Sequence, residues 1–150
     1  MRSPYIYTWR VGTGMPTHEM RVVVPAPLPE VFDFLSSVSN VPLFAPGIDE
    51  AVLLGGAQGL QGASLGLRTR SGRELRAQIT HFHADASWTV VDERSTVLQV
   101  QVEPSRGGTL VVSTLTGSWR PDQAARVVSE WERLMRELPA RVAGVAVAAP

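Results

Sequence analysis

The stretch from residue 48 to residue 119 constrains the fold most, because short strand-like segments alternate there with turn signals. The segments, rich in β-branched and apolar residues, fall near 48–55, 62–70, 74–83, 87–94, 97–104 and 109–119. The breaks between them, such as Ser71-Gly72 and Gly107-Gly108, are a few residues long. Because a parallel crossover needs a dozen or more residues, these breaks predict antiparallel hairpins.

The residues before and after this stretch predict one more strand, two short helices and a long terminal helix. Met20, Val22 and Val24 alternate with polar neighbours, which is typical of a strand with one wet face. LPEVFDFLSSV then places apolar residues at helical spacing, and Asn40 could cap a short second helix. From Pro121 a long helix has one apolar and one charged face, and we expect Pro139 to kink or end it.

This order of elements predicts an α+β domain with a seven-stranded antiparallel sheet. A sheet with one apolar face must be covered by another element, and the terminal helix carries a matching apolar stripe. We therefore expect a curved sheet wrapped around that helix. The sizes of the facing side chains decide whether the space between them is filled or open.

Three segments resemble the START-like, polyketide cyclase/dehydratase (SRPBCC) superfamily. VVVPAPLPEVFDFLSSVSNVPLFAPGI resembles its opening, ITHFHADASWTVVDER its central hairpin, and GTLVVSTLTGSW with the long helix its ending. The resemblance covers roughly residues 17–143 and implies the helix-grip fold with a hydrophobic ligand cavity. It departs at Ala84-Asp85-Ala86, where an Asp-Pro corner is usual, and at residues 1–16. We thus expect an extension over 1–16 and a START-like domain over 17–150.

Such a cavity would take an apolar or aromatic molecule, lipid-like or polyketide-like, between the sheet and the terminal helix. Strand alternation and the helix stripe give its expected lining: Phe44, Leu65, Leu67, Ala77, Ile79, Trp88, Val100, Val111, Trp131 and Met135. In the segment 87–94 the alternation is ambiguous, since Trp88 and Val90 compete with Thr89 and Val91. Residues 38–47 could form a lid with Phe44 as its tip, or a short packed helix.

The histidines of ITHFHA leave three interpretations open. A metal site needs three or more ligands, and no HExxH or carboxylate-rich pattern completes His81 and His83, so we expect no metal and no cofactor. As acids or bases, the two histidines with Ser113 would make the protein a cyclase or dehydratase. A bulge near Phe82 would instead reverse the alternation and move His81 or His83 to the cavity mouth or into solvent.

The charge and the residue composition narrow the classes of partner and the location that we expect for this protein. The net charge is zero and the arginines are scattered, which argues against a nucleic-acid partner, and the absence of cysteine excludes disulfides and thiolate chemistry. The N-terminus lacks a signal-peptide core and VAGVAVAAP is too short to span a bilayer, so we expect a cytoplasmic protein without a membrane span. The aromatic residues of 1–16 could dock on a second copy, which leaves a homodimer and a non-enzymatic interaction module as alternatives.

Overall fold

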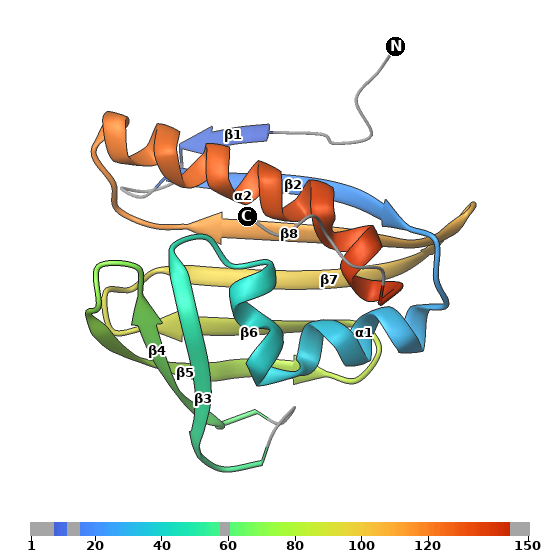
Figure 1. Ribbon diagram of the computed structural model, residues 1–150, viewed down its shortest axis with the longest axis horizontal. Helices are drawn as coiled ribbons and strands as arrows, with labels where there is room; N and C mark the ends of the chain where they lie inside the picture. The colour runs from blue at the N-terminus through green and yellow to red at the C-terminus, as the bar shows by residue number, and fades with distance from the viewer. Residues whose placement is uncertain (1–7, 12–15, 58–60, 145–150) are drawn as a thin grey trace.

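One antiparallel sheet forms the body of the computed structural model, which describes residues 8–11, 16–57 and 61–144. Within these residues the strand order is β1-β2-β8-β7-β6-β5-β4-β3 (Figure 1). The strands are β1 (Thr8–Val11), β2 (Pro16–Val24), β3 (Ile48–Gly55), β4 (Ser64–Thr69), β5 (Glu74–His83), β6 (Ser87–Asp92), β7 (Val97–Ser105) and β8 (Gly108–Thr116). The predicted seven-stranded antiparallel sheet is confirmed as β2 to β8, and β1 adds a short strand beside β2. The rest of the extension 1–16 lies outside the described residues.

Two short helices, α1 (Leu28–Ser36) and the 3-10 helix η1 (Val38–Leu43), connect β2 to β3. A proline in the first turn of α1, where its missing N–H is no loss, and Glu30 beside it favour the start of this helix. The prediction that Asn40 caps the second helix is wrong, because η1 begins at Val38. Asn40 Nδ2 instead donates to the Phe34 carbonyl at 3.0 Å and ties η1 to α1.

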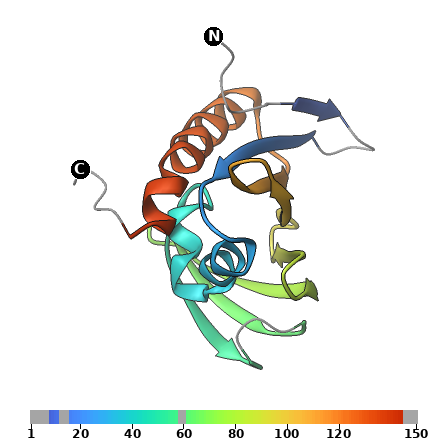
Figure 2. The ribbon, with the colours of Figure 1, turned by 90° about the vertical axis from the view of Figure 1, so that its right-hand side faces the viewer.

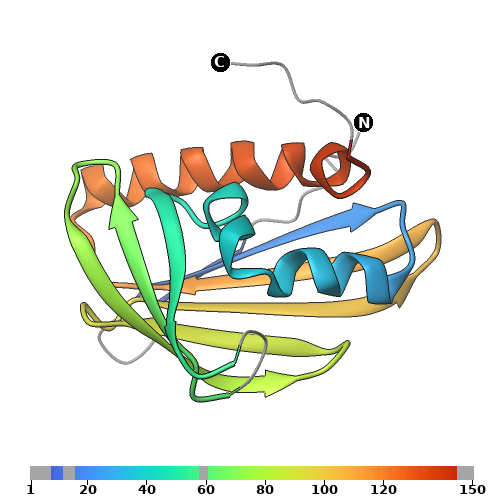
Figure 3. The ribbon, with the colours of Figure 1, turned by 60° about the horizontal axis from the view of Figure 1, so that its bottom comes forward.

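The terminal helix α2 (Pro121–Val142) continues for three residues beyond Pro139. Figure 3 shows the last turn of α2 inclined to the axis of the turns before it, as a proline inside a helix favours. Among the described helices, none combines the length and the apolar character that crossing a membrane requires.

The sheet curves around α1 and η1, and α2 runs along the side formed by β2 (Figures 2 and 3). Trp131, Leu134, Met135 and Leu138 are buried on the inner face of α2. Each side chain of this size contributes about 1.5–3 kcal/mol when fully buried. This arrangement is the helix-grip fold that the sequence predicts.

Glu130 fastens α2 to the opposite end of the sheet. Its Oε2 accepts a hydrogen bond from the Gly47 N–H at 2.9 Å, and its Oε1 pairs with the Arg70 guanidinium. Gly47 lies between η1 and β3, and Arg70 follows β4. One largely buried carboxylate therefore holds the long helix against both segments.

Candidate functional site

Two voids lie between the concave face of the sheet and the α1–η1 segment. The first, which we call the Trp88 void, measures about 20 Å³. Its lining is Leu35, Ser36, Val38, Val41, Ala63, Leu65, Ile79, Phe82 and Trp88. The second, the Asp92 void, measures about 50 Å³. Its lining is Val41, Ala45, Pro46, Ile48, Leu65, Leu67, Ala77, Val90, Asp92, Arg94, Thr96, Leu98 and Leu115.

Val41 and Leu65 border both voids and therefore separate them. Val41 comes from η1 and Leu65 from β4, so the partition between the voids is built from the short helix and the sheet. Drug-sized ligands occupy pockets of roughly 300–1,000 Å³, whereas a single water needs about 10–15 Å³. In this conformation the voids hold a few waters at most.

The sequence predicts a cavity beneath the terminal helix, and the structure places the open space elsewhere. Among the described residues, none from α2 borders either void. Trp131 and Leu138 are completely buried and fill the region beneath α2. The remaining space is beneath η1, the segment interpreted above as either a lid or a packed helix.

Five of the ten expected ligand contacts border the voids. Leu65 borders both, Ile79 and Trp88 border the Trp88 void, and Leu67 and Ala77 border the Asp92 void. Phe44 borders neither, but its ring packs on Trp88 with centroids 5.8 Å apart. The other four, Val100, Val111, Trp131 and Met135, are core residues away from the voids.

Residues of the 38–47 segment and of the β6–β7 turn line the voids without having been predicted as lining. Val41, Ala45 and Pro46 come from the segment that the sequence leaves as either a lid or a packed helix. Asp92 lines the void because β6 buries Trp88, Val90 and Asp92, so the ambiguous alternation of the segment 87–94 is resolved in favour of Trp88 and Val90. Asp92 Oδ1 accepts the backbone N–H groups of Arg94 and Thr96 at 2.8 and 3.1 Å, so this buried carboxylate holds the turn.

The two histidines of ITHFHA lie outside the voids. A register shift between Ile79 and His81 ends the inward alternation, as the bulge interpretation required. His81 and His83 are consequently exposed, and Phe82 turns inward to contact Phe32, with ring centroids 5.6 Å apart.

Ser113 is buried on β8 but borders neither void. A catalytic role for His81, His83 and Ser113 stays a prediction, and the structure does not bring these three residues to a common cavity.

The third histidine, His18, is completely buried on β2. Its ring lies 6.1 Å from that of Trp119, measured between centroids. Burial lowers the pKa of His18 below its ordinary value of 6.5, because desolvation disfavours the charged imidazolium. Within the described ranges, no group of three His, Asp or Glu side chains could hold a metal ion.

Buried tryptophan N–H groups are the unusual polar feature of this interior. The Nε1 atoms of Trp88 and Trp131 are buried and have no hydrogen-bond acceptor among the described residues. A buried donor without an acceptor costs about 1–3 kcal/mol. Trp88 borders a void whereas Trp131 borders neither of the two.

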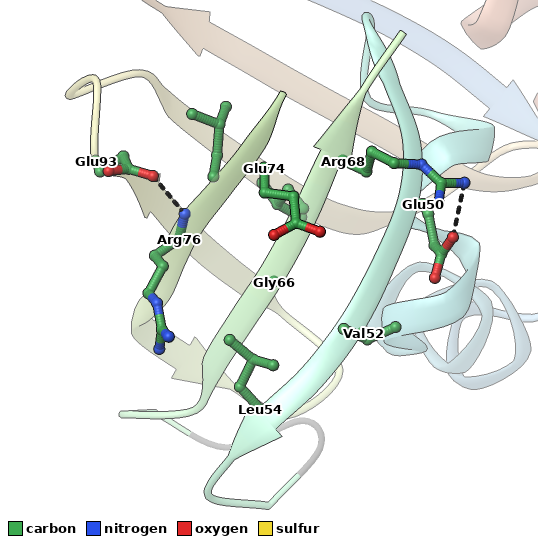
Figure 4. Close-up of a pocket in the computed structure, with 10 residues that line it drawn as sticks. Glu50, Val52, Leu54, Gly66, Arg68, Glu74, Arg76 and Glu93 are labelled. Carbon is green, nitrogen blue, oxygen red and sulfur yellow. Dashed lines mark hydrogen bonds and ion pairs between the residues drawn. The ribbon is translucent and has the colours of Figure 1, made fainter. Parts of the chain in front are cut away.

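A larger hollow of about 500 Å³ lies on β3, β4 and β5 (Figure 4). Gly66 lies among its lining residues, and a Cβ there would lie 3.2 Å from the Val52 side chain and 3.3 Å from that of Leu54. Glu50 and Arg68 form an ion pair of 2.8 Å at its rim, with both side chains about half exposed. Paired, solvated charges of this kind contribute little, so this hollow is a weaker candidate than the two voids.

Comparison with known proteins supports the fold. No family model matches the chain, and no curated protein matches it. Among solved structures, protein SSP2350 of Staphylococcus saprophyticus matches with a TM-score of 0.65 and 17% identity, over 89% of this chain and 97% of that one. The conserved protein EF2215 of Enterococcus faecalis matches with a TM-score of 0.69 and 13% identity, over 96% of this chain and 80% of that one.

The Aha1 dimer of Colwellia psychrerythraea, solved in solution, matches with a TM-score of 0.65 and 14% identity, over 84% of this chain and 95% of that one. Likeness at these identities concerns the fold alone. The chain has the helix-grip architecture of small bacterial proteins with an antiparallel sheet and a long terminal helix.

Proposed function

We propose that this protein is a START-like domain that binds an apolar or aromatic small molecule between the sheet and the α1–η1 segment. The observation that carries the proposal is the pair of voids that meet at Val41 and Leu65. The Trp88 void has no charged side chain among its described lining residues, and the charges of the Asp92 void are confined to Asp92 and Arg94. A mostly apolar lining with a few polar groups is typical of ligand sites.

Binding requires η1 to move, because the voids are smaller than any such ligand. Val41 is the residue that η1 contributes to the border of both voids, so it must move away from the sheet for the voids to join. A 3-10 helix has poorer hydrogen-bond geometry than an α-helix, so η1 is the element that can shift at the lowest cost. A ligand that favours the open arrangement would then shift the population toward it.

Native mass spectrometry of the purified full chain tests this proposal. The expected result is a population with added mass that disappears after extraction with organic solvent, and the extract then contains the compound. The proposal fails if the protein carries no added mass and naphthalene, supplied as a probe, does not bind saturably.

A separate observation favours a second candidate, an interaction through the edge of the sheet. Val52, Leu53 and Leu54 on the edge strand β3 are 43%, 39% and 50% exposed. An exposed apolar edge strand can pair with another chain. In this alternative two copies associate through β3. Analytical ultracentrifugation should then show a dimer that Leu54→Glu converts to a monomer, and a wild-type monomer at all concentrations would exclude it.

A further inference from the structure

Trp88 borders the Trp88 void and carries a buried hydrogen-bond donor, Nε1, that has no acceptor among the described residues. Phe44 packs on its ring, so the indole is held in place by an aromatic contact. Buried N–H groups in native proteins almost always have a partner, which can be protein, water or ligand.

The lining of the void that Trp88 borders specifies the chemistry of a molecule that enters there. Among the described lining residues, Ser36 is the other one with a polar side chain, and its hydroxyl already donates to the Phe32 carbonyl at 2.7 Å. Because none of these lining residues is charged, an ionised group placed there would lose its hydration without gaining a counter-ion. The partner is therefore a neutral group that accepts a hydrogen bond.

Trp131 provides an internal comparison. Its Nε1 is also buried without an acceptor, but Trp131 borders neither void. A molecule that enters the Trp88 void beneath η1 therefore lies next to Trp88 and not next to Trp131.

We propose that Trp88 is the polar anchor of the binding site and donates its indole N–H to a neutral oxygen, such as a ketone or ester carbonyl, on an otherwise apolar ligand. This inference rests on the proposed function, since it assumes that a small molecule enters beneath η1. It narrows the ligand class to neutral carbonyl-bearing apolar compounds and disfavours both carboxylates and plain hydrocarbons.

Two probes of nearly equal shape test the anchor: 2-acetylnaphthalene, which has a carbonyl oxygen, and 2-isopropenylnaphthalene, which has a methylene group in its place. Both are titrated into ¹⁵N-labelled full-length protein while the tryptophan indole N–H resonances are recorded. The expected result is that both probes bind, the ketone binds about threefold to tenfold more tightly, and only the ketone moves the Trp88 resonance downfield.

Variants complete the test. Trp88→Phe keeps an aromatic side chain but removes the indole N–H, so it should remove the preference for the ketone, whereas the matched variant Trp131→Phe should retain it. If both probes bind wild-type protein equally and leave the Trp88 resonance unshifted, the anchor is refuted while the proposed function stands. If neither probe binds, the anchor is refuted, and the proposed function fails as well if the purified protein also carries no added mass and does not bind naphthalene. The wild-type titration decides between these outcomes even if Trp88→Phe does not fold.

Discussion

Val41→Ala should destabilise the protein and at the same time create a binding cavity. Val41 separates the Trp88 and Asp92 voids, which measure about 20 and 50 Å³. Removing two methyl-sized groups costs about 1.6 kcal/mol in transfer free energy, at roughly 0.8 kcal/mol for each group. A residual cavity of about 40 Å³ adds about 1 kcal/mol. The expected loss in the free energy of unfolding is thus about 2–3 kcal/mol, a substantial part of the roughly 5–15 kcal/mol typical of a domain.

The joined space, on the order of 100 Å³, approaches the size of engineered apolar cavities that bind benzene and xenon. Benzene at ten times its dissociation constant should therefore restore about 1.4 kcal/mol to Val41→Ala. Urea unfolding with and without benzene measures both quantities.

Val31→Ala is the matched control for this experiment. Val31 is completely buried on α1 and borders neither void, so its truncation leaves an isolated cavity too small for benzene. We expect a similar loss of stability and no restoration. The reasoning is refuted if benzene stabilises both variants equally, or if it stabilises neither.

Three further predictions follow from single contacts. Glu130→Gln should cost about 1.5–3 kcal/mol of unfolding free energy, because this largely buried carboxylate accepts a backbone N–H and pairs with an arginine. Glu132→Gln on the exposed face of α2 should cost under about 0.5 kcal/mol. Urea unfolding compares the two variants, and equal costs would contradict the role of Glu130 as a tether. Because burial lowers the pKa of His18, the unfolded chain binds more protons than the folded protein at pH values between the lowered pKa and the ordinary 6.5. The free energy of unfolding should therefore fall as the pH drops through this window, and His18→Gln should flatten this fall. An unchanged slope of the urea midpoint against pH in the variant would contradict this prediction. Gly107 and Gly108 both have positive φ, +89° and +141°. A Cβ on Gly108 would collide with the backbone at the end of β2, whereas a Cβ on Gly107 would meet nothing within 4 Å. Gly108→Ala should therefore lower the melting temperature more than Gly107→Ala does.

The sheet and the terminal helix could be predicted from the sequence because their signals are local and repeated. The alternation of β5 from Leu75 to Ile79 and the turn residues around it fix both the strand and its buried face. The bulge at Ile79 and His81 changes the face without changing the composition, so the sequence could only raise it as an alternative.

The position of the open space could not be predicted, because it depends on how completely distant side chains fill a shared volume. Trp131 and Met135 carry the apolar stripe that identifies α2, and those same bulky groups close the space beneath it. Val41 and Pro46 lie in a segment with no strong periodicity, and their place beside β4 follows from the tertiary fold. The missing acceptor of Trp88 is likewise a property of the packed interior.

The central claim is that the region where Val41 meets Leu65 opens to admit a small molecule. Intermolecular nuclear Overhauser effects between bound 2-acetylnaphthalene and the methyl groups of the labelled protein test it most directly. The account predicts contacts from the probe to Val41, Leu65 and Ile79. Contacts to Val52 and Leu54 on the outer hollow, with none to these three residues, would contradict it.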